Sequence, residues 1–73
     1  MGAVRTKITI EVIDHEATGA DVRRTRKAVG LSLRDVADKT GLSTTYLSQL
    51  ETGHRPWNDN LFDVVMAAIT ELA

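Results

Sequence analysis

Residues 33–52, LRDVADKTGLSTTYLSQLET, contain two short stretches with helical spacing of apolar residues, separated by a single glycine. Each stretch has an apolar edge of two residues, which are Val36 and Ala37 in the first and Leu47 and Leu50 in the second. Gly41 lies where the chain must reverse direction after a helix, and glycine adopts the left-handed conformation needed there without strain. The pattern therefore predicts two short helices that cross at a steep angle over one small core.

Capping residues mark where these two helices begin. Ser32 is followed three residues later by Asp35, which approximates a capping box before a helix over residues 33–40. Ser43 is the expected N-cap of the next helix. The small side chain of Ala37 suits a close crossing, because a larger one would push the two helices apart. Together these positions predict a helix-turn-helix.

The chain has 73 residues and no cysteine, so neither a disulfide nor a thiolate metal site is possible. A domain of this size gains only modest stability from its own core, and a partner chain would help. The N-terminal stretch lacks the apolar run of a signal peptide, and no run of about 18 apolar residues exists to span a bilayer. We therefore expect a soluble, cytoplasmic protein without a cofactor.

Charge is distributed unevenly along the chain, although the net charge is only −1. Residues 19–57 hold seven basic and four acidic side chains, whereas the two ends together hold two basic and six acidic ones. For an anionic partner this distribution matters more than the sum. The positive charge coincides with the predicted helix-turn-helix, which keeps a nucleic-acid partner possible.

The helix after Gly41 carries short uncharged side chains on its outer face. With the two leucines inward, the residues that point outward or flank the first turn are Thr44, Thr45, Ser48, Gln49 and Thr52. Such side chains suit DNA base edges, because glutamine can form two hydrogen bonds with adenine and threonine can contact a thymine methyl group. Elsewhere they would be ordinary surface residues. Their place on the second helix of this motif favours base recognition.

A further helix is predicted on the N-terminal side of the motif, over residues 20–29. Its cap is either Thr18 or Gly19. Its expected inward residues are Val22 and Val29. Arg26 lies one turn after Val22 and should therefore lean toward the edge of the core.

The last predicted helix follows Asn58 or Asp59, either of which can cap it. Its inward stripe consists of Leu61, Val64, Val65, Ala68, Ile69 and Leu72. Phe62 and Met66, one turn apart, form a second apolar strip. Because so small a domain cannot easily bury two faces of one helix, this strip is a candidate dimer surface. Trp57 is expected to pack over the edge of the core, with a DNA backbone as the alternative contact.

Residues 7–13, KITIEVI, alternate polar and apolar side chains, which is a strand pattern rich in β-branched residues. Its apolar face consists of Ile8, Ile10 and Val12. No second strand pattern occurs in the sequence, and an unpaired strand leaves its backbone groups without partners. We expect the strand to pair with its copy across a homodimer, the alternative being a flexible tail. The chain would then divide into a dimerisation arm, residues 1–18, and a helix-turn-helix domain, residues 19–73.

The run RRTRKAVGLSLRDVADKTGLSTTYLSQLETGHRP resembles the Cro/repressor class of lambda repressor-like helix-turn-helix proteins, which are small bacterial and phage transcriptional regulators. The similarity extends over residues 19–72. The family's alanine, glycine and apolar turn positions fall on Ala37, Gly41 and Leu47. The resemblance implies an all-α domain of four helices, preceded in this chain by the predicted strand.

The resemblance also implies roles for individual residues. It implies an ion pair between Arg26 of the first helix and Glu51 near the end of the recognition helix. It also implies that Thr44, Thr45 and Gln49 read bases and that Ser43 and Arg55 approach phosphates. With Ser48 from the outward face of the same helix, the expected base-reading residues are Thr44, Thr45, Ser48 and Gln49. Together with further arginines and one tyrosine, the expected phosphate contacts are Arg23, Arg24, Arg34, Ser43, Tyr46 and Arg55. Leu33 departs from the family, because many members carry a phosphate-binding glutamine there, so that contact must come from backbone N–H groups or from Arg34.

The sequence thus predicts a sequence-specific DNA-binding regulator, most simply a Cro-like repressor that binds a pseudo-palindromic operator as a homodimer. The same fold could serve an antitoxin that represses its own operon and binds a toxin through the acidic last helix or the N-terminal strand. A restriction-modification controller and an architectural recombination factor are further alternatives. An enzyme is disfavoured, because acids, bases and nucleophiles are scattered. A metal site is disfavoured too, because the adjacent Asp14, His15 and Glu16 cannot all face one ion.

Overall fold

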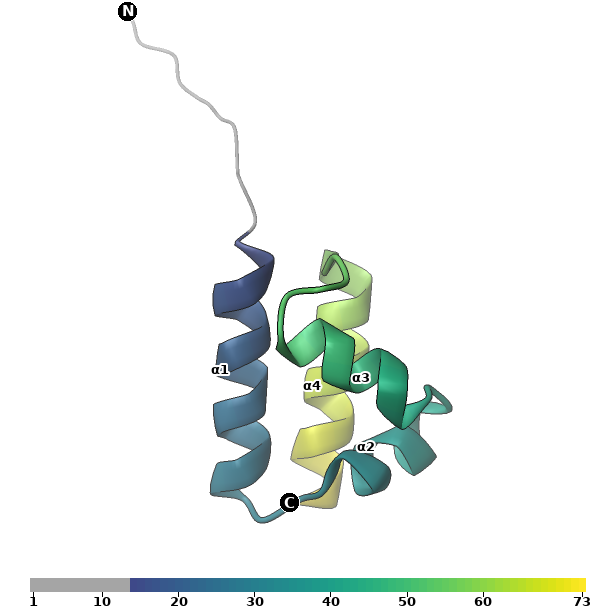
Figure 1. Ribbon diagram of the computed structural model, residues 1–73. Helices are drawn as coiled ribbons and strands as arrows, with labels where there is room; N and C mark the ends of the chain where they lie inside the picture. The colour runs from purple at the N-terminus through teal and green to yellow at the C-terminus, as the bar shows by residue number, and fades with distance from the viewer. Residues whose placement is uncertain (1–13) are drawn as a thin grey trace, which may run out of the picture.

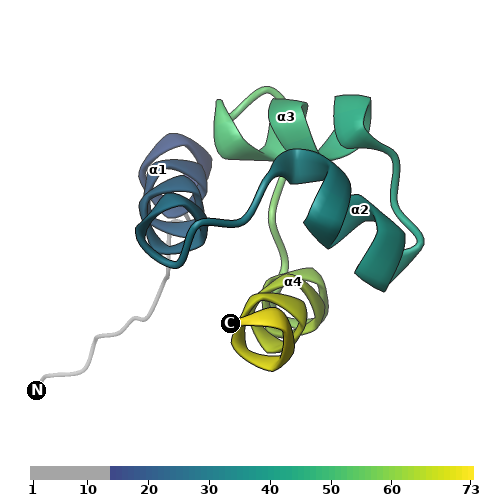
Figure 2. The same cartoon turned by 90° about the horizontal axis from the view of Figure 1, so that it is seen from below.

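Four α-helices make up the part of the chain that the computed structural model describes, residues 14–73. They are α1 (His15–Ala28), α2 (Leu33–Thr40), α3 (Thr44–Glu51) and α4 (Asp59–Leu72). Helix α3 packs against α1 and α2, and α4 packs against the same two helices from the other side (Figures 1 and 2). The all-helical prediction is confirmed for these residues, whereas the predicted strand at residues 7–13 lies outside them.

The turn between α2 and α3 is built as the sequence predicts. Ser32 Oγ accepts a hydrogen bond from the backbone N–H of Asp35 at 3.1 Å, and the Asp35 carboxylate accepts one from the backbone N–H of Ser32 at 2.9 Å. Gly41 ends α2 in the left-handed conformation, with φ of 80°. Ser43 Oγ then caps α3 by accepting from the backbone N–H of Tyr46 at 3.0 Å. The ends of both helices are therefore fixed by local contacts.

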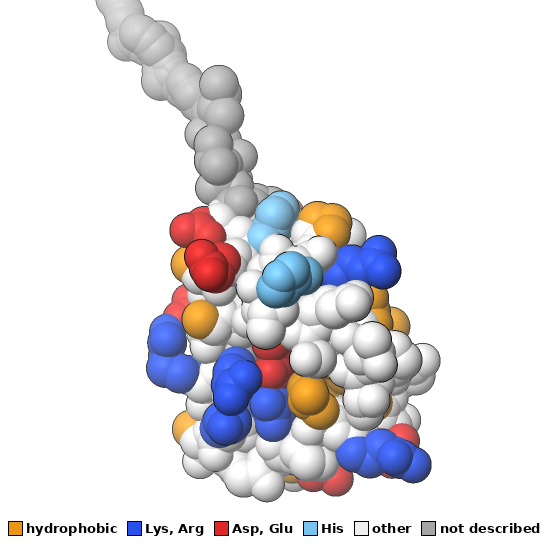
Figure 3. Space-filling model, viewed as in Figure 1, with side chains coloured by type: hydrophobic (Ala, Val, Ile, Leu, Met, Phe, Trp, Pro, Cys, Tyr) orange, Lys and Arg blue, Asp and Glu red, His pale blue; other side chains and the backbone are white. Residues whose placement is uncertain are grey.

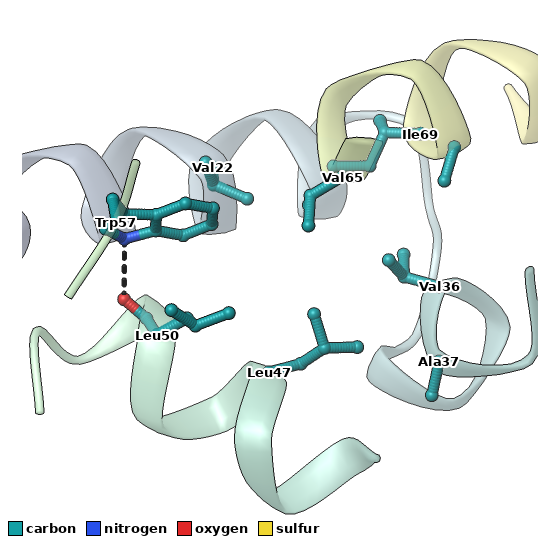
Figure 4. Close-up of a cluster of buried hydrophobic side chains, with 9 residues drawn as sticks. Val22, Val36, Ala37, Leu47, Leu50, Trp57, Val65 and Ile69 are labelled. Atoms are coloured by element: carbon teal, nitrogen blue, oxygen red, sulfur yellow. Dashed lines mark hydrogen bonds between the residues drawn. The ribbon is translucent and has the colours of Figure 1, made fainter. Parts of the chain in front are cut away.

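The hydrophobic core lies where the four helices meet (Figure 4). Its largest fully buried side chains are Val22, Val36, Leu47, Leu50, Val65 and Ile69. Trp57 joins the core from the loop between α3 and α4, and only 4% of it is exposed. Its indole Nε1 donates to the Leu50 carbonyl oxygen at 3.0 Å, which satisfies the one polar group that the ring brings into the core. The prediction that Trp57 packs against the core is confirmed.

Helix α1 begins at His15, earlier than predicted. Asp14, rather than Thr18 or Gly19, is its N-cap, and the Asp14 side chain accepts a hydrogen bond from a backbone N–H of the first turn at 3.0 Å. Gly19 lies inside the helix, where a Cβ atom would come within 2.3 Å of the Leu50 carbonyl oxygen. The glycine therefore allows a close approach between α1 and the end of α3. Glycine serves both helix ends and close contacts, and the sequence pattern does not separate the two uses.

The early start of α1 bears on the predicted division of the chain. Residues 14–18, which the sequence pattern places in the arm, are the cap and first turn of α1. The rest of the arm lies outside the described residues, so the division at residue 18 stays a prediction.

Three apolar residues expected to face inward are partly exposed, namely Val29 (43%), Val64 (43%) and Leu72 (38%). Val29 follows the last residue of α1, where the chain turns toward α2. Val64 lies at the margin of the inward stripe and lines an open groove between α2 and α4, which Lys39 and Glu71 bridge with an ion pair of 3.0 Å. Leu72 falls in the last turn of α4. Periodicity places a residue on a face but does not supply a neighbour to cover it, so these three predictions are wrong.

None of the four helices described has the length and hydropathy needed to span a bilayer.

Candidate nucleic-acid interface

Helix α3 presents an uncharged polar face to solvent. Thr44, Thr45 and Ser48 are exposed on it, and Gln49 is half-buried at its margin. The two leucines on the opposite side of the helix are fully buried. Hydroxyl and amide groups can both donate and accept hydrogen bonds, which is what the major-groove edges of base pairs require. The four residues expected to read bases therefore share one surface.

A buried ion pair holds the far end of α3 against α1. Arg26 Nε donates to Glu51 Oε2 at 2.8 Å, and Arg26 Nη2 donates to Glu51 Oε1 at 3.0 Å, so the pairing is bidentate. Arg26 Nη1 also donates to the Leu31 carbonyl oxygen at 2.7 Å. Only 6% of either charged residue is exposed. The pair that the family resemblance implies is thus present, and it fixes the polar face of α3 relative to α1.

The loop after α3 is anchored at both of its ends. The backbone N–H of His54 donates to the Gln49 carbonyl oxygen at 2.8 Å, which closes the last turn of α3. Besides its indole hydrogen bond to α3, Trp57 donates its backbone N–H to His15 Nδ1 at 2.9 Å. Sequence reasoning missed this second contact, because 42 positions separate the two residues and no pattern connects them. Arg55 therefore lies between two fixed points of the loop.

Arg55 contacts the polar face of α3 through its guanidinium group. Its Nε donates to Gln49 Oε1 at 2.9 Å, and its Cζ lies 5.9 Å from the centroid of the Tyr46 ring. That distance allows a cation–π interaction. Tyr46 is itself half-buried and packs against the core. Two expected phosphate contacts and one expected base contact thus form a single connected group.

The other residues expected to contact phosphates differ in the hydrogen bonds and ion pairs that they form within the protein. The Ser43 hydroxyl oxygen caps α3, which leaves its O–H able to donate elsewhere. Arg24 pairs with an aspartate one turn earlier, and Arg34 Nε lies 3.5 Å from Asp38 Oδ1; both pairs are on the surface. Exposed ion pairs of this kind contribute little to folding stability, so the arginine can exchange its aspartate partner for a phosphate. Arg23 is exposed on α1.

The surface over α3 is flanked by positive charge (Figure 3). Basic side chains gather over α1 on one side, and others lie near α2 and near the loop after α3 on the other side. Between them the surface is largely uncharged. This arrangement suits duplex DNA, in which two rows of phosphates flank the base edges of a groove.

The apolar strip on α4 takes part in the packing of the protomer itself. Phe62 is 36% exposed, and its ring packs edge-on against Trp57, with the two ring centroids 6.1 Å apart. Met66 is half-buried and packs against the core. The other expected dimer contacts, Ile8, Ile10 and Val12, lie outside the described residues.

These features define a class, the DNA-binding helix-turn-helix regulators of transcription. The features that define it are an exposed polar helix, a buried ion pair that fixes this helix, and basic side chains on both sides of it. Within residues 14–73, no three histidine, cysteine, aspartate or glutamate side chains come together as a metal ion would require.

Comparison with known proteins places the chain within that class. The chain belongs to the helix-turn-helix family of the lambda repressor-like type, and the family model matches residues 22–64. A solved structure of the clp gene regulator ClgR from C. glutamicum is 35% identical, with a TM-score of 0.77, over 82% of this chain and 78% of that one. A second ClgR structure from Corynebacterium glutamicum is 34% identical, with a TM-score of 0.75, over 84% of this chain and 65% of that one. No curated protein sequence matches the chain in a direct comparison.

Proposed function

We propose that the protein is a small Cro-like repressor that recognises one operator sequence with α3 in the major groove. The observation that carries the proposal is the exposure of Thr44, Thr45 and Ser48 on a helix whose opposite side is locked into the core. Base contacts from these residues and from Gln49 provide specificity, while basic side chains and helix N-termini set the register on the phosphates. The likeness to a clp gene regulator supports a role in transcription.

The repressor acts as a homodimer. Two copies of α3 then lie about one helical turn, roughly 34 Å, apart on a pseudo-palindromic operator. The small core, the alternating pattern of residues 7–13 and the exposed part of Phe62 support this assembly. Proline cannot donate a ladder hydrogen bond, so Ile10→Pro should shift the sedimentation of the protein toward monomer and weaken operator binding through lost avidity. A dimer that survives this substitution would rule out the strand as its interface.

Selection of bound fragments from random duplex DNA tests sequence-specific recognition. We expect the selected fragments to converge on two related half-sites, and a salt titration on the winning fragment to separate phosphate contacts from base contacts. Gln49→Ala should weaken binding to the selected site by about 1–3 kcal/mol and leave binding to random DNA nearly unchanged. Asn60→Ala, an exposed polar residue of α4, is the matched control and should alter neither.

Two outcomes would contradict the proposal at different levels. Failure of the fragments to converge would exclude an operator. An equal loss of affinity on selected and random DNA would show that Gln49 reads no base. A reporter gene placed behind the selected site tests repression, and its expression should fall when the protein is present.

A further inference from the structure

Arg55 and Gln49 are joined by a hydrogen bond on the surface that is proposed to face DNA. We propose that Arg55 determines specificity by orienting Gln49, so that Gln49 offers its N–H groups, and not its carbonyl oxygen, to a base. The same arginine then contacts the neighbouring phosphate through its remaining N–H groups. This inference rests on the proposed function, because it names what one residue of that interface recognises and which residue prepares it.

The amide of Gln49 has two chemically different ends. A free glutamine amide rotates broadly about its last torsion and can present either its carbonyl acceptor or its N–H donors to a partner. Here the carbonyl oxygen Oε1 accepts from Arg55 Nε at 2.9 Å, and the residue is half-buried. Because the amide is planar, fixing Oε1 on Arg55 turns the Nε2 donors away from the arginine, so that they are the end of the amide that a base can meet. Gln49 is thereby prepared as a donor.

A donor at this position discriminates among bases. In the major groove, guanine presents two acceptors, adenine presents N7 and thymine presents O4, whereas cytosine presents only the N4 donor. A donor on Gln49 can therefore form a hydrogen bond with guanine, adenine or thymine at the position that it contacts, but not with cytosine. The expected discrimination against cytosine is at least about fivefold, the lower end of the range of about 5-fold to 150-fold for a good bidentate contact between a side chain and a base.

Arg55 has the geometry for both parts of this role. The guanidinium carries five N–H donors in a rigid fork, of which Nε serves Gln49. In the part of the chain that the structure describes, no hydrogen bond or ion pair engages its two Nη groups. Its stacking over Tyr46, and the anchors at His54 and Trp57 on either side, restrict the positions that it can take. Lysine cannot substitute, because a single ammonium lacks a fork that serves an amide and a phosphate together.

The test is a base-preference profile of the full chain on its selected operator. The position read by Gln49 is the one whose preference changes in Gln49→Ala. At that position the wild type should disfavour cytosine, and Arg55→Lys should reduce the discrimination at least about fivefold while leaving the slope of affinity against salt unchanged. Arg55→Ala should reduce both, the slope by about 0.9 per protomer. Lys39→Arg is the matched control, because this exposed residue of α2 pairs with Glu71 of α4 and has no expected DNA contact, and it should leave the profile intact.

A double mutant separates positioning from general weakening. If Arg55 acts through Gln49, adding Arg55→Lys to Gln49→Ala should not change the profile further. Circular dichroism should show that all variants remain folded, because both side chains lie at the surface or its margin. An unchanged profile in Arg55→Lys, or a wild-type preference for cytosine, would overturn this inference and leave the operator proposal intact. Absence of any selected sequence would instead overturn the proposed function.

Discussion

Arg26 and Glu51 lie 25 positions apart in the sequence and meet in a buried bidentate ion pair that joins α1 to the last residue of α3. The contact does more than neutralise two charges. It fixes the orientation of the polar face of α3 relative to α1, and the proposed base contacts depend on that orientation. The fold also depends on both members of the pair, because the loss of one leaves an unpaired charge buried in the protein.

Replacement of Arg26 should therefore destabilise the protein strongly. We expect Arg26→Met to lower the free energy of unfolding by about 3–5 kcal/mol, because the Glu51 carboxylate is left buried without its partner. Urea denaturation followed by circular dichroism measures the change. The control is Arg34→Met, which breaks the exposed pair with Asp38 and should cost no more than about 0.5 kcal/mol. Equal effects of the two substitutions would contradict the assigned role of the buried pair.

Gly19→Ala should destabilise the protein although alanine is the better helix former. Inside an isolated helix the substitution would gain about 1 kcal/mol. Here the new Cβ would lie 2.3 Å from the Leu50 carbonyl oxygen and 2.6 Å from that of Glu51, and both are backbone atoms that cannot move aside. We expect a net loss of about 1–3 kcal/mol in the same urea assay. Ala28→Gly, at the exposed end of α1, should lose about 1 kcal/mol through propensity alone. A stabilised Gly19→Ala variant would show that α1 and α3 do not approach this closely.

Neighbouring valines of α4 should respond differently to truncation. Val65 is 1% exposed and Val64 is 43% exposed. Val65→Ala should cost about 2 kcal/mol, because two buried methyl groups are lost and a cavity remains. Val64→Ala should change stability by no more than about 0.5 kcal/mol. Thermal unfolding of the two variants compares them directly, and the reverse order would mean that α4 is rotated from the orientation described.

The capping box of α2 should make stability depend on pH in the acid range. Hydrogen bonds from the backbone N–H and then the side chain of Ser32 lower the pKa of the Asp35 carboxyl below its ordinary value of 3.8. Because the folded pKa is the lower one, this stabilisation is complete above the unfolded pKa and is lost as the pH falls through the folded pKa. Asp35→Asn should be less stable than wild type at neutral pH, and the difference should narrow below the ordinary pKa. Urea unfolding at several pH values measures this difference in the free energy of unfolding, and Asp63→Asn is the control for removing an exposed carboxylate. A difference that stays constant with pH would contradict the ionic role of Asp35.

Much of the helix-turn-helix could be predicted because its determinants are local. The pairing of Ser32 with Asp35, the left-handed Gly41 and the Ser43 cap act over three or four residues, and each is present in the structure. The helical spacing of apolar residues likewise identified Leu47 and Leu50 as buried.

What could not be predicted depends on the third dimension. Gly19 resembles a helix start in the sequence, and only the proximity of α3 explains it. The hydrogen bond from Trp57 to His15 and the one from Arg55 to Gln49 join residues with no periodic relation. For the same reason, the sequence could predict Gln49 as a base-reading residue but could not show that Arg55 holds the carbonyl end of its amide.

The proposed contact between α3 and DNA bases can be observed as intermolecular nuclear Overhauser effects in a complex with the selected duplex. We expect effects between the side-chain protons of Thr44, Thr45 and Ser48 and the thymine methyl or cytosine H5 protons of the major groove, and none to protons of α4. Effects confined to α4, or to sugar protons of the minor groove, would contradict it.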